Sequence, residues 1–231
     1  IGGFALTQTA PVIIYAYASL SLVALYGNYQ LVITGITALM GALFNSMNAG
    51  VGNLVAEGNR ERILKVFEEL FASRFLLCCT ACFGVYTLTP AFISLWVGPE
   101  YLLDDLTLAL LTAILYINLS RLTVDSYLYA YGLFSDIGAP IAEAAMNIGL
   151  SVLLGYFRGL HGILAGMLCS LVAVIFLWKP WYLFRRGLRM SPTWYAALYA
   201  RHLAALLPVA VAAAATLRLI PFDPFAGIGE W

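Results

Sequence analysis

A chain of 231 residues in which 62% of the side chains are hydrophobic and only 10% are charged has too few charges for a water-soluble surface, since soluble domains carry about 25%. Twelve basic and twelve acidic residues leave no net charge, so nucleic acid is not an expected partner. The apolar residues gather in stretches of roughly 20, the length that crosses a bilayer core, and we predict an all-α, multi-pass membrane protein surrounded by the lipid bilayer.

Seven stretches are long and apolar enough to be transmembrane helices, and short polar or glycine-containing breaks separate them. They cover residues 4–23, 29–56, 70–97, 106–131, 140–156, 163–178 and 203–220. We place the first break at Tyr26-Gly27-Asn28 and the fifth at residues 158–162. The chain then divides into a six-helix unit (1–184), a basic connection (185–202) and an additional transmembrane helix with its tail (203–231).

The segment 57–69 is the first charged stretch, and its apolar side predicts a helix at the membrane surface. Arg74 lies one turn inside the third span, from which we expect its long side chain to extend back to the lipid headgroups. Pro90 is expected to kink that helix. Asp104 and Asp105 should open the next helix, because carboxylates are favourable at its positive dipole end.

The distribution of basic residues predicts the orientation of the seven spans. One side would receive eight cations and the other only two. The eight are Arg60, Arg62, Lys65, Lys179, Arg185, Arg186, Arg189 and Arg201, and the two are Arg158 and Arg218. The positive-inside rule therefore places 57–69 and 179–202 in the cytoplasm, with 98–105 and 158–162 outside.

The four cysteines all lie in apolar stretches. Cys79 and Cys82 have the CxxC spacing, but the chain has no second ligand pair and no βαβ pattern to go with it. We therefore interpret Cys78, Cys79, Cys82 and Cys169 as small buried side chains. Neither a metal ion nor a cofactor is expected.

Polar side chains interrupt the fourth and fifth spans. Arg121 and Asp125 are four residues apart and share one helix face, with Asn118 nearby, while Glu143 and Asn147 share a face of the next helix. Such charges are costly in lipid, so they should face a protein interior or a watery cavity. Either they bind a ligand there, or Arg121 and Asp125 neutralise each other and tie helices together. Glu143 can alternatively cap its helix, whose first turn we place at Pro140, or face the cytoplasmic mouth.

Four short segments, in this order and spacing, resemble one family of transporters. They are YGNYQLV (26–32), GVGNLVA (50–56), LWVGPEYLL (95–103) and YGLFSD (131–136), followed by the run Pro140, Glu143, Asn147, Ser151, Gly159, Gly162 and Gly166. The chain is similar over residues 9 to 185 to the Wzx-type polysaccharide and O-antigen flippases of the multidrug/oligosaccharidyl-lipid/polysaccharide, MATE-like, superfamily.

The resemblance implies two six-helix lobes around a central cavity. This chain would be the second lobe plus one extra helix, with the first lobe absent and supplied by the same protein or by a separate chain. The implied location is the cytoplasmic membrane of a bacterium or archaeon, in the synthesis of lipopolysaccharide or another cell-envelope polysaccharide. Where such proteins often have Thr-Asp, this chain has Thr9-Ala10-Pro11, which removes the acidic group of that site.

The implied function is transport of a lipid-linked oligosaccharide, a polyprenyl-diphosphate glycan, by alternating access. Arg121 would hold the diphosphate, with Asn118, Asp125, Asn147 and Glu143 as its polar neighbours in the cavity. One alternative is a drug/cation antiporter of the same superfamily, against which the missing acid at position 10 argues. Another is a membrane enzyme of glycan assembly, a polymerase or ligase, which usually needs a larger outer loop than this chain offers. We expect a transporter and not an enzyme.

Overall fold

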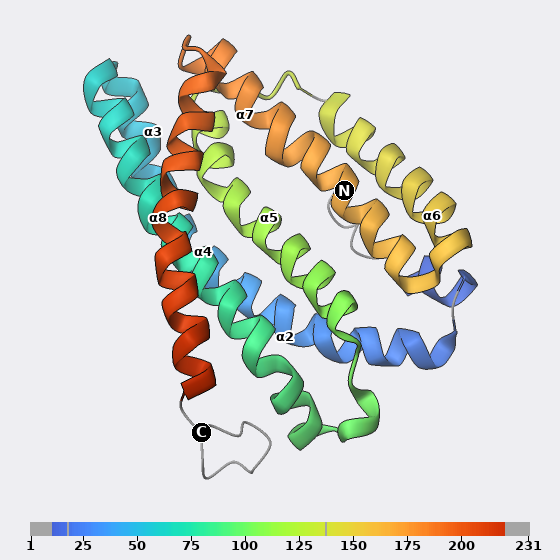
Figure 1. Ribbon diagram of the computed structural model, residues 1–231. Helices are drawn as coiled ribbons and strands as arrows, with labels where there is room; N and C mark the ends of the chain where they lie inside the picture. The colour runs from blue at the N-terminus through green and yellow to red at the C-terminus, as the bar shows by residue number, and fades with distance from the viewer. Residues whose placement is uncertain (1–10, 18, 137, 220–231) are drawn as a thin grey trace.

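The computed structural model describes residues 11–17, 19–136 and 138–219, and all regular structure in these ranges is helical (Figure 1). Several of the helices are long and apolar enough to cross a membrane. This confirms the prediction of an all-α, multi-pass membrane protein. Of the first predicted span, residues 4–10 lie outside the described ranges, while 11–17 are helical.

Helix α2 (Leu20–Asn45) begins after Ser19, whose hydroxyl accepts a hydrogen bond from the Leu22 N–H. It runs without interruption through Gly27, so the predicted break at 26–28 is wrong. Tyr26 and Tyr29 are buried on either side of this glycine, and their packing outweighs the roughly 1 kcal/mol that one glycine costs a helix. The helix is interrupted instead at residues 46–47, after which α3 (Asn48–Glu57) follows.

Helix α4 (Arg60–Trp96) joins the predicted surface segment and the third span in one helix of 37 residues. At 1.5 Å per residue it is about 55 Å long, so it extends well beyond a bilayer core of about 30 Å. Pro90 lies inside it. A short 3₁₀ turn, η1 (Pro99–Tyr101), leads to α5 (Asp105–Ala130), which Asp104 caps as its N-cap residue. The prediction that Asp104 and Asp105 open this helix is confirmed.

Helix α6 (Gly138–Leu171) is a hairpin of two helical arms that reverses at Gly159. That residue has φ 54° and ψ −132°, a conformation that glycine adopts without the steric cost of a side chain. The arms are held by hydrogen bonds from Ser151 Oγ to the Ile163 carbonyl (3.1 Å) and from Asn147 Nδ2 to Ser170 Oγ (3.2 Å). The predicted break at 158–162 is therefore confirmed.

The second arm continues through a π-helical segment η2 (Val172–Trp178), a short α7 (Lys179–Tyr182) and a second π-helical segment η3 (Leu183–Gly187). Helix α8 (Pro192–Leu219) then returns along the bundle beside α4 (Figure 1). Residues 192–202, expected in the basic connection, form the N-terminal part of this helix. They are helical there because Tyr195 and Tyr199 pack their rings on Phe71, with centroids 5.6 and 5.5 Å apart.

The ends of the helices form two groups at opposite ends of the bundle (Figure 1). At one end, Arg60 Nη2 donates to the Arg189 carbonyl oxygen at 3.3 Å. At the other, the Asp104 carboxylate lies 2.8 Å from His161 Nε2. The segments predicted to share a side therefore lie together, while their assignment to the cytoplasm or the outside stays a prediction.

A candidate ligand cavity between α2, α5 and α6

A polar cavity of about 560 Å³ lies between α2, α3, α5 and α6. All five residues that the sequence predicted for the site line it, although they come from two helices and span 30 positions. Its polar lining comprises Gln30, Thr34, Thr37, Asn45, Asn48, Asn118, Arg121, Asp125, Ser126, Glu143 and Asn147. A bundle that is otherwise apolar therefore gathers amides, hydroxyls and charges around one space.

Arg121 and Asp125 form an ion pair within α5. Arg121 Nε donates to Asp125 Oδ2 at 2.7 Å, as their i, i+4 spacing allows. The Arg121 side chain is 31% exposed and the Asp125 side chain 9%. Arg121 is thus open to the cavity, while the carboxylate is almost enclosed.

Lys179 makes a second ion pair with the same carboxylate. Its Nζ donates to Asp125 Oδ1 at 2.9 Å, and its side chain is only 14% exposed. The sequence counted Lys179 among the cytoplasmic cations; the structure shows its side chain largely buried in this ion pair, while the side of the membrane on which it lies stays a prediction. The local sequence suggested an interfacial position for Lys179, because a lysine between Trp178 and Pro180 at the end of an apolar stretch is typical of a membrane anchor. No pattern along the chain identifies this ion pair, because only the fold brings Lys179 to Asp125.

Glu143 is buried and lines the cavity, but it takes part in none of the ion pairs within 4.0 Å in the described part of the chain. It does not cap α6. The helix begins at Gly138, two residues before the predicted start at Pro140, so Pro140 lies in its first turn and Glu143 lies beyond it. Asn147 bonds Ser170 across the hairpin, and Asn118 Nδ2 donates to the Ile114 carbonyl at 3.0 Å. Because Glu143 lines the cavity and forms no ion pair with the described residues, its carboxylate is available to a ligand there.

Arg74 is buried beside the cavity, so the prediction that it extends to the headgroups is wrong. It is 2% exposed, its Nη2 donates to the Phe44 carbonyl at 3.2 Å, and its guanidinium lies 5.0 Å from the Phe44 ring centroid. Phe44 is in the last turn of α2, where carbonyl oxygens form the negative end of the helix dipole. That helix end and the aromatic ring stabilise the charge inside the protein, a tertiary arrangement that sequence reasoning missed.

A hydroxyl connects Arg74 to the wall of the cavity. Arg74 Nη1 donates to Ser126 Oγ at 3.1 Å, and that oxygen lies 2.6 Å from Asn48 Oδ1. Asn48 Nδ2 in turn donates to Asn45 Oδ1 at 3.2 Å. These bonds join α4, α5 and the α2–α3 corner, so they position the polar side chains at this end of the cavity.

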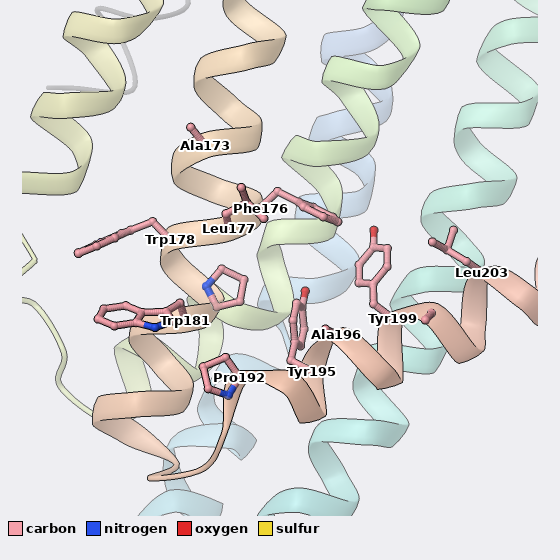
Figure 2. Close-up of a pocket in the computed structure, with 12 residues that line it drawn as sticks. Ala173, Phe176, Leu177, Trp178, Trp181, Pro192, Tyr195, Ala196, Tyr199 and Leu203 are labelled. Atoms are coloured by element: carbon pink, nitrogen blue, oxygen red, sulfur yellow. The ribbon is translucent and has the colours of Figure 1, made fainter.

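Two apolar hollows lie between α8 and the rest of the bundle. The larger, about 700 Å³, is bordered by η2 and α7 on one side and by α8 on the other, with Trp178, Trp181, Tyr195 and Tyr199 among its lining (Figure 2). It offers no charged group, so it does not suit an ionic ligand. The second, about 650 Å³, contains Cys79 and Cys82. Cys78 and Cys82 are buried as expected, whereas Cys79 is half-buried and Cys169 is exposed, contrary to the expectation for these two.

No family model, no curated protein and no solved structure matches the chain. The polar cavity and the resemblance of the short segments therefore remain as the two guides to its function. The two guides share residues: Glu143 and Asn147 belong to the run that begins at Pro140 and resembles the flippases, and both also line the cavity.

Proposed function

We propose that this chain is the second lobe of a membrane transporter that moves a lipid-linked oligosaccharide, a polyprenyl-diphosphate glycan, across the cytoplasmic membrane. The observation that carries the proposal is the polar cavity with Arg121 on its wall, inside an apolar helical bundle. A guanidinium stays charged and holds phosphate oxygens in a bidentate geometry. Arg121 is therefore suited to the diphosphate.

The remaining lining suits sugars. A glycan that enters a membrane loses its hydration, and hydroxyls and amides can replace the lost hydrogen bonds. Gln30, Thr34, Thr37 and Asn45 offer such groups from α2, facing Arg121 and Asp125 on α5. The cavity volume falls within the usual range of small-molecule sites.

Alternating access requires one bundle to move against another around a site near the middle of the membrane. The bundle described here would supply one wall of that site, and a first lobe, from the same protein or from a separate chain, would supply the other. Without it, the polar face around Arg121 and Asp125 would meet lipid at considerable cost. We expect the chain to transport only together with a first lobe.

Arg121 gives the sharpest test of this proposal. Arg121→Ala and Arg121→Lys should both impair the transfer of a fluorescent polyprenyl-diphosphate oligosaccharide across vesicles that contain both lobes, at unchanged protein level. Lysine keeps the charge but loses the bidentate fork. Arg158→Gln, an exposed arginine in the hairpin turn, is the matched control and should transport normally. Full activity of Arg121→Ala would refute the proposal.

A drug/cation antiporter is the second candidate, and Glu143 favours it, since its carboxylate faces the cavity without an ion-pair partner in the described residues. In that case Glu143→Gln should abolish cation-coupled efflux of an organic cation from vesicles. A glycan transporter should show no such efflux with Glu143 or with the glutamine variant. The two assays on the same vesicles therefore separate the candidates.

A further inference from the structure

We infer that Arg121 and Lys179 together form a two-cation site for a phosphate or diphosphate group, and that Asp125 occupies this site as an internal anion when no ligand is bound. The inference deepens the proposed function and rests on it for the lipid carrier. The site itself is defined by three side chains on two segments, α5 and α7, and Lys179 lies 54 positions after Asp125 in the chain.

Asp125 is shared evenly between the two cations. Arg121 Nε contacts one carboxylate oxygen at 2.7 Å and Lys179 Nζ contacts the other at 2.9 Å. A phosphate presents at least two anionic oxygens to donors in the same way, and phosphates and carboxylates are bound by the same charged groups. Since a single carboxylate bridges the two cations, a single phosphate can bridge them as well.

Burial gives the order in which a ligand would meet these groups. Arg121, 31% exposed, lines the cavity, whereas Lys179, 14% exposed, contacts the other oxygen of Asp125 and is not part of the lining. A buried ammonium needs an anionic partner. An entering phosphate that contacts Arg121 first can therefore reach Lys179 only by displacing Asp125, and it then replaces the partner that Lys179 loses.

The backbone around Lys179 is suited to such a displacement. Lys179 begins a four-residue α-helical segment with π-helical segments directly before and after it, η2 and η3. π-Helical turns are rare and are frequent at functional sites. A change of one such turn to α-helical geometry rotates the residues that follow about the helix axis, so Lys179 can move relative to Asp125 without unfolding of the helix.

No phosphate can bind while Asp125 occupies the site. The apparent affinity for a phosphate ligand is therefore the intrinsic affinity multiplied by the fraction of molecules in which Asp125 has left the site. Asp125→Asn removes this competitor and should tighten the binding of inorganic pyrophosphate by about tenfold, within the usual range of coupling between sites. Lys179→Gln should weaken it by about tenfold, because one of the two cations is lost. Binding is measured by calorimetry on the full chain in nanodiscs of phosphatidylcholine, which contribute no net charge.

Matched controls are available on the exposed surface. Asp105→Asn and Lys65→Gln make the same changes of charge at exposed positions and should leave binding unchanged. If Asp125→Asn lowers the melting temperature, saturating pyrophosphate should restore it, since the ligand replaces the missing anion. Unchanged or weaker binding by Asp125→Asn, wild-type binding by Lys179→Gln, or a melting temperature that stays low with pyrophosphate would each overturn the inference.

Farnesyl diphosphate, measured beside pyrophosphate, distinguishes a lipid headgroup from free phosphate. Tighter binding of the lipid supports the headgroup as the source, and equal binding supports the phosphate group alone. Because binding is measured without transport, the two ideas can fail separately. If the chain binds pyrophosphate as expected but no glycan is moved across vesicles that contain both lobes, the proposed function is refuted. If those vesicles move glycan but the affinity for pyrophosphate is unchanged by Asp125→Asn, only the two-cation site is refuted.

Discussion

The close crossing of the two arms of α6 predicts a large effect of adding single methyl groups at Gly162 and Gly166. A Cβ at Gly162 would overlap the backbone carbonyl of Leu154, and one at Gly166 would lie 2.5 Å from the Ser151 nitrogen and 2.6 Å from the Leu150 carbonyl carbon. Ordinary van der Waals contacts begin at 3.4 Å. The obstacles are backbone atoms, so no rotamer change can relieve them.

Gly162→Ala and Gly166→Ala must therefore push the arms apart. Overpacking typically costs about 1–3 kcal/mol, and separation also lengthens the Ser151–Ile163 and Asn147–Ser170 hydrogen bonds, each worth about 1 kcal/mol. Replacing a helical glycine by alanine returns at most about 1 kcal/mol. The net expected loss of unfolding free energy is about 2 kcal/mol for each variant.

Gly149→Ala is the matched control, because it lies on the exposed face of the same helix and its added Cβ would meet nothing within 4 Å. It should be neutral or stabilising by up to about 1 kcal/mol. Thermal unfolding of the purified chain in detergent, followed by helical circular dichroism, measures all three variants. Equal melting temperatures for Gly149→Ala and Gly162→Ala would refute the close crossing of the arms.

Further outcomes are expected at the buried arginine, the two ends and the outer turn. Arg74→Met should change the unfolding free energy by no more than about 1 kcal/mol, since Arg74 Nε already lacks a partner in the described structure. Arg74→Ala should cost about 2–4 kcal/mol because of the cavity that it leaves, and equal losses for the two variants would contradict this reasoning. In a cysteine-free background, cysteines replacing the exposed Glu61 and Arg158 should react with a membrane-impermeant thiol reagent from opposite sides, and reaction of both from one side would contradict the topology. Partial burial raises the pKa of Asp104, but hydrogen bonds from Thr107 and contact with His161 lower it overall from 3.8 to about 2. Its contribution to stability should therefore be complete above about pH 4 and lost as the pH falls towards 2. Asp104→Asn should remove that part of the pH dependence of the melting temperature, and an unaltered profile would contradict the assignment.

The elements that the sequence predicted are those set by local chemistry. Hydropathy over about 20 residues identifies membrane helices without any tertiary knowledge. The carboxylate of Asp104 before an apolar stretch predicts a helix start, and the glycines around residue 159 predict a reversal. The polar face of α5 was also predictable, because Arg121 and Asp125 are four residues apart on any helix.

The errors arose where tertiary packing decides. Gly27 marks a break only if the flanking tyrosines are solvent-exposed, and here Tyr26 and Tyr29 are buried. The surroundings of Lys179 resemble those of a membrane anchor, and only the fold brings it to Asp125. Which helix end meets Arg74 depends on how α2 and α4 cross, and no pattern along the chain contains that information.

Arg74 and Arg121 are alike in sequence, each an isolated arginine in an apolar stretch, but the structure stabilises their charges in opposite ways. Arg74 is surrounded by permanent neutral partners, a helix-end carbonyl, a hydroxyl and an aromatic ring, and is closed to the cavity. Arg121 is paired with one carboxylate, that of Asp125, and its side chain remains 31% exposed. A cation enclosed by neutral partners and closed to the cavity cannot exchange them for a ligand, whereas a cation that is open to the cavity and paired with a carboxylate side chain can exchange that partner for an anionic ligand. That difference is why we propose the anion site at Arg121 and a structural role for Arg74 beside it.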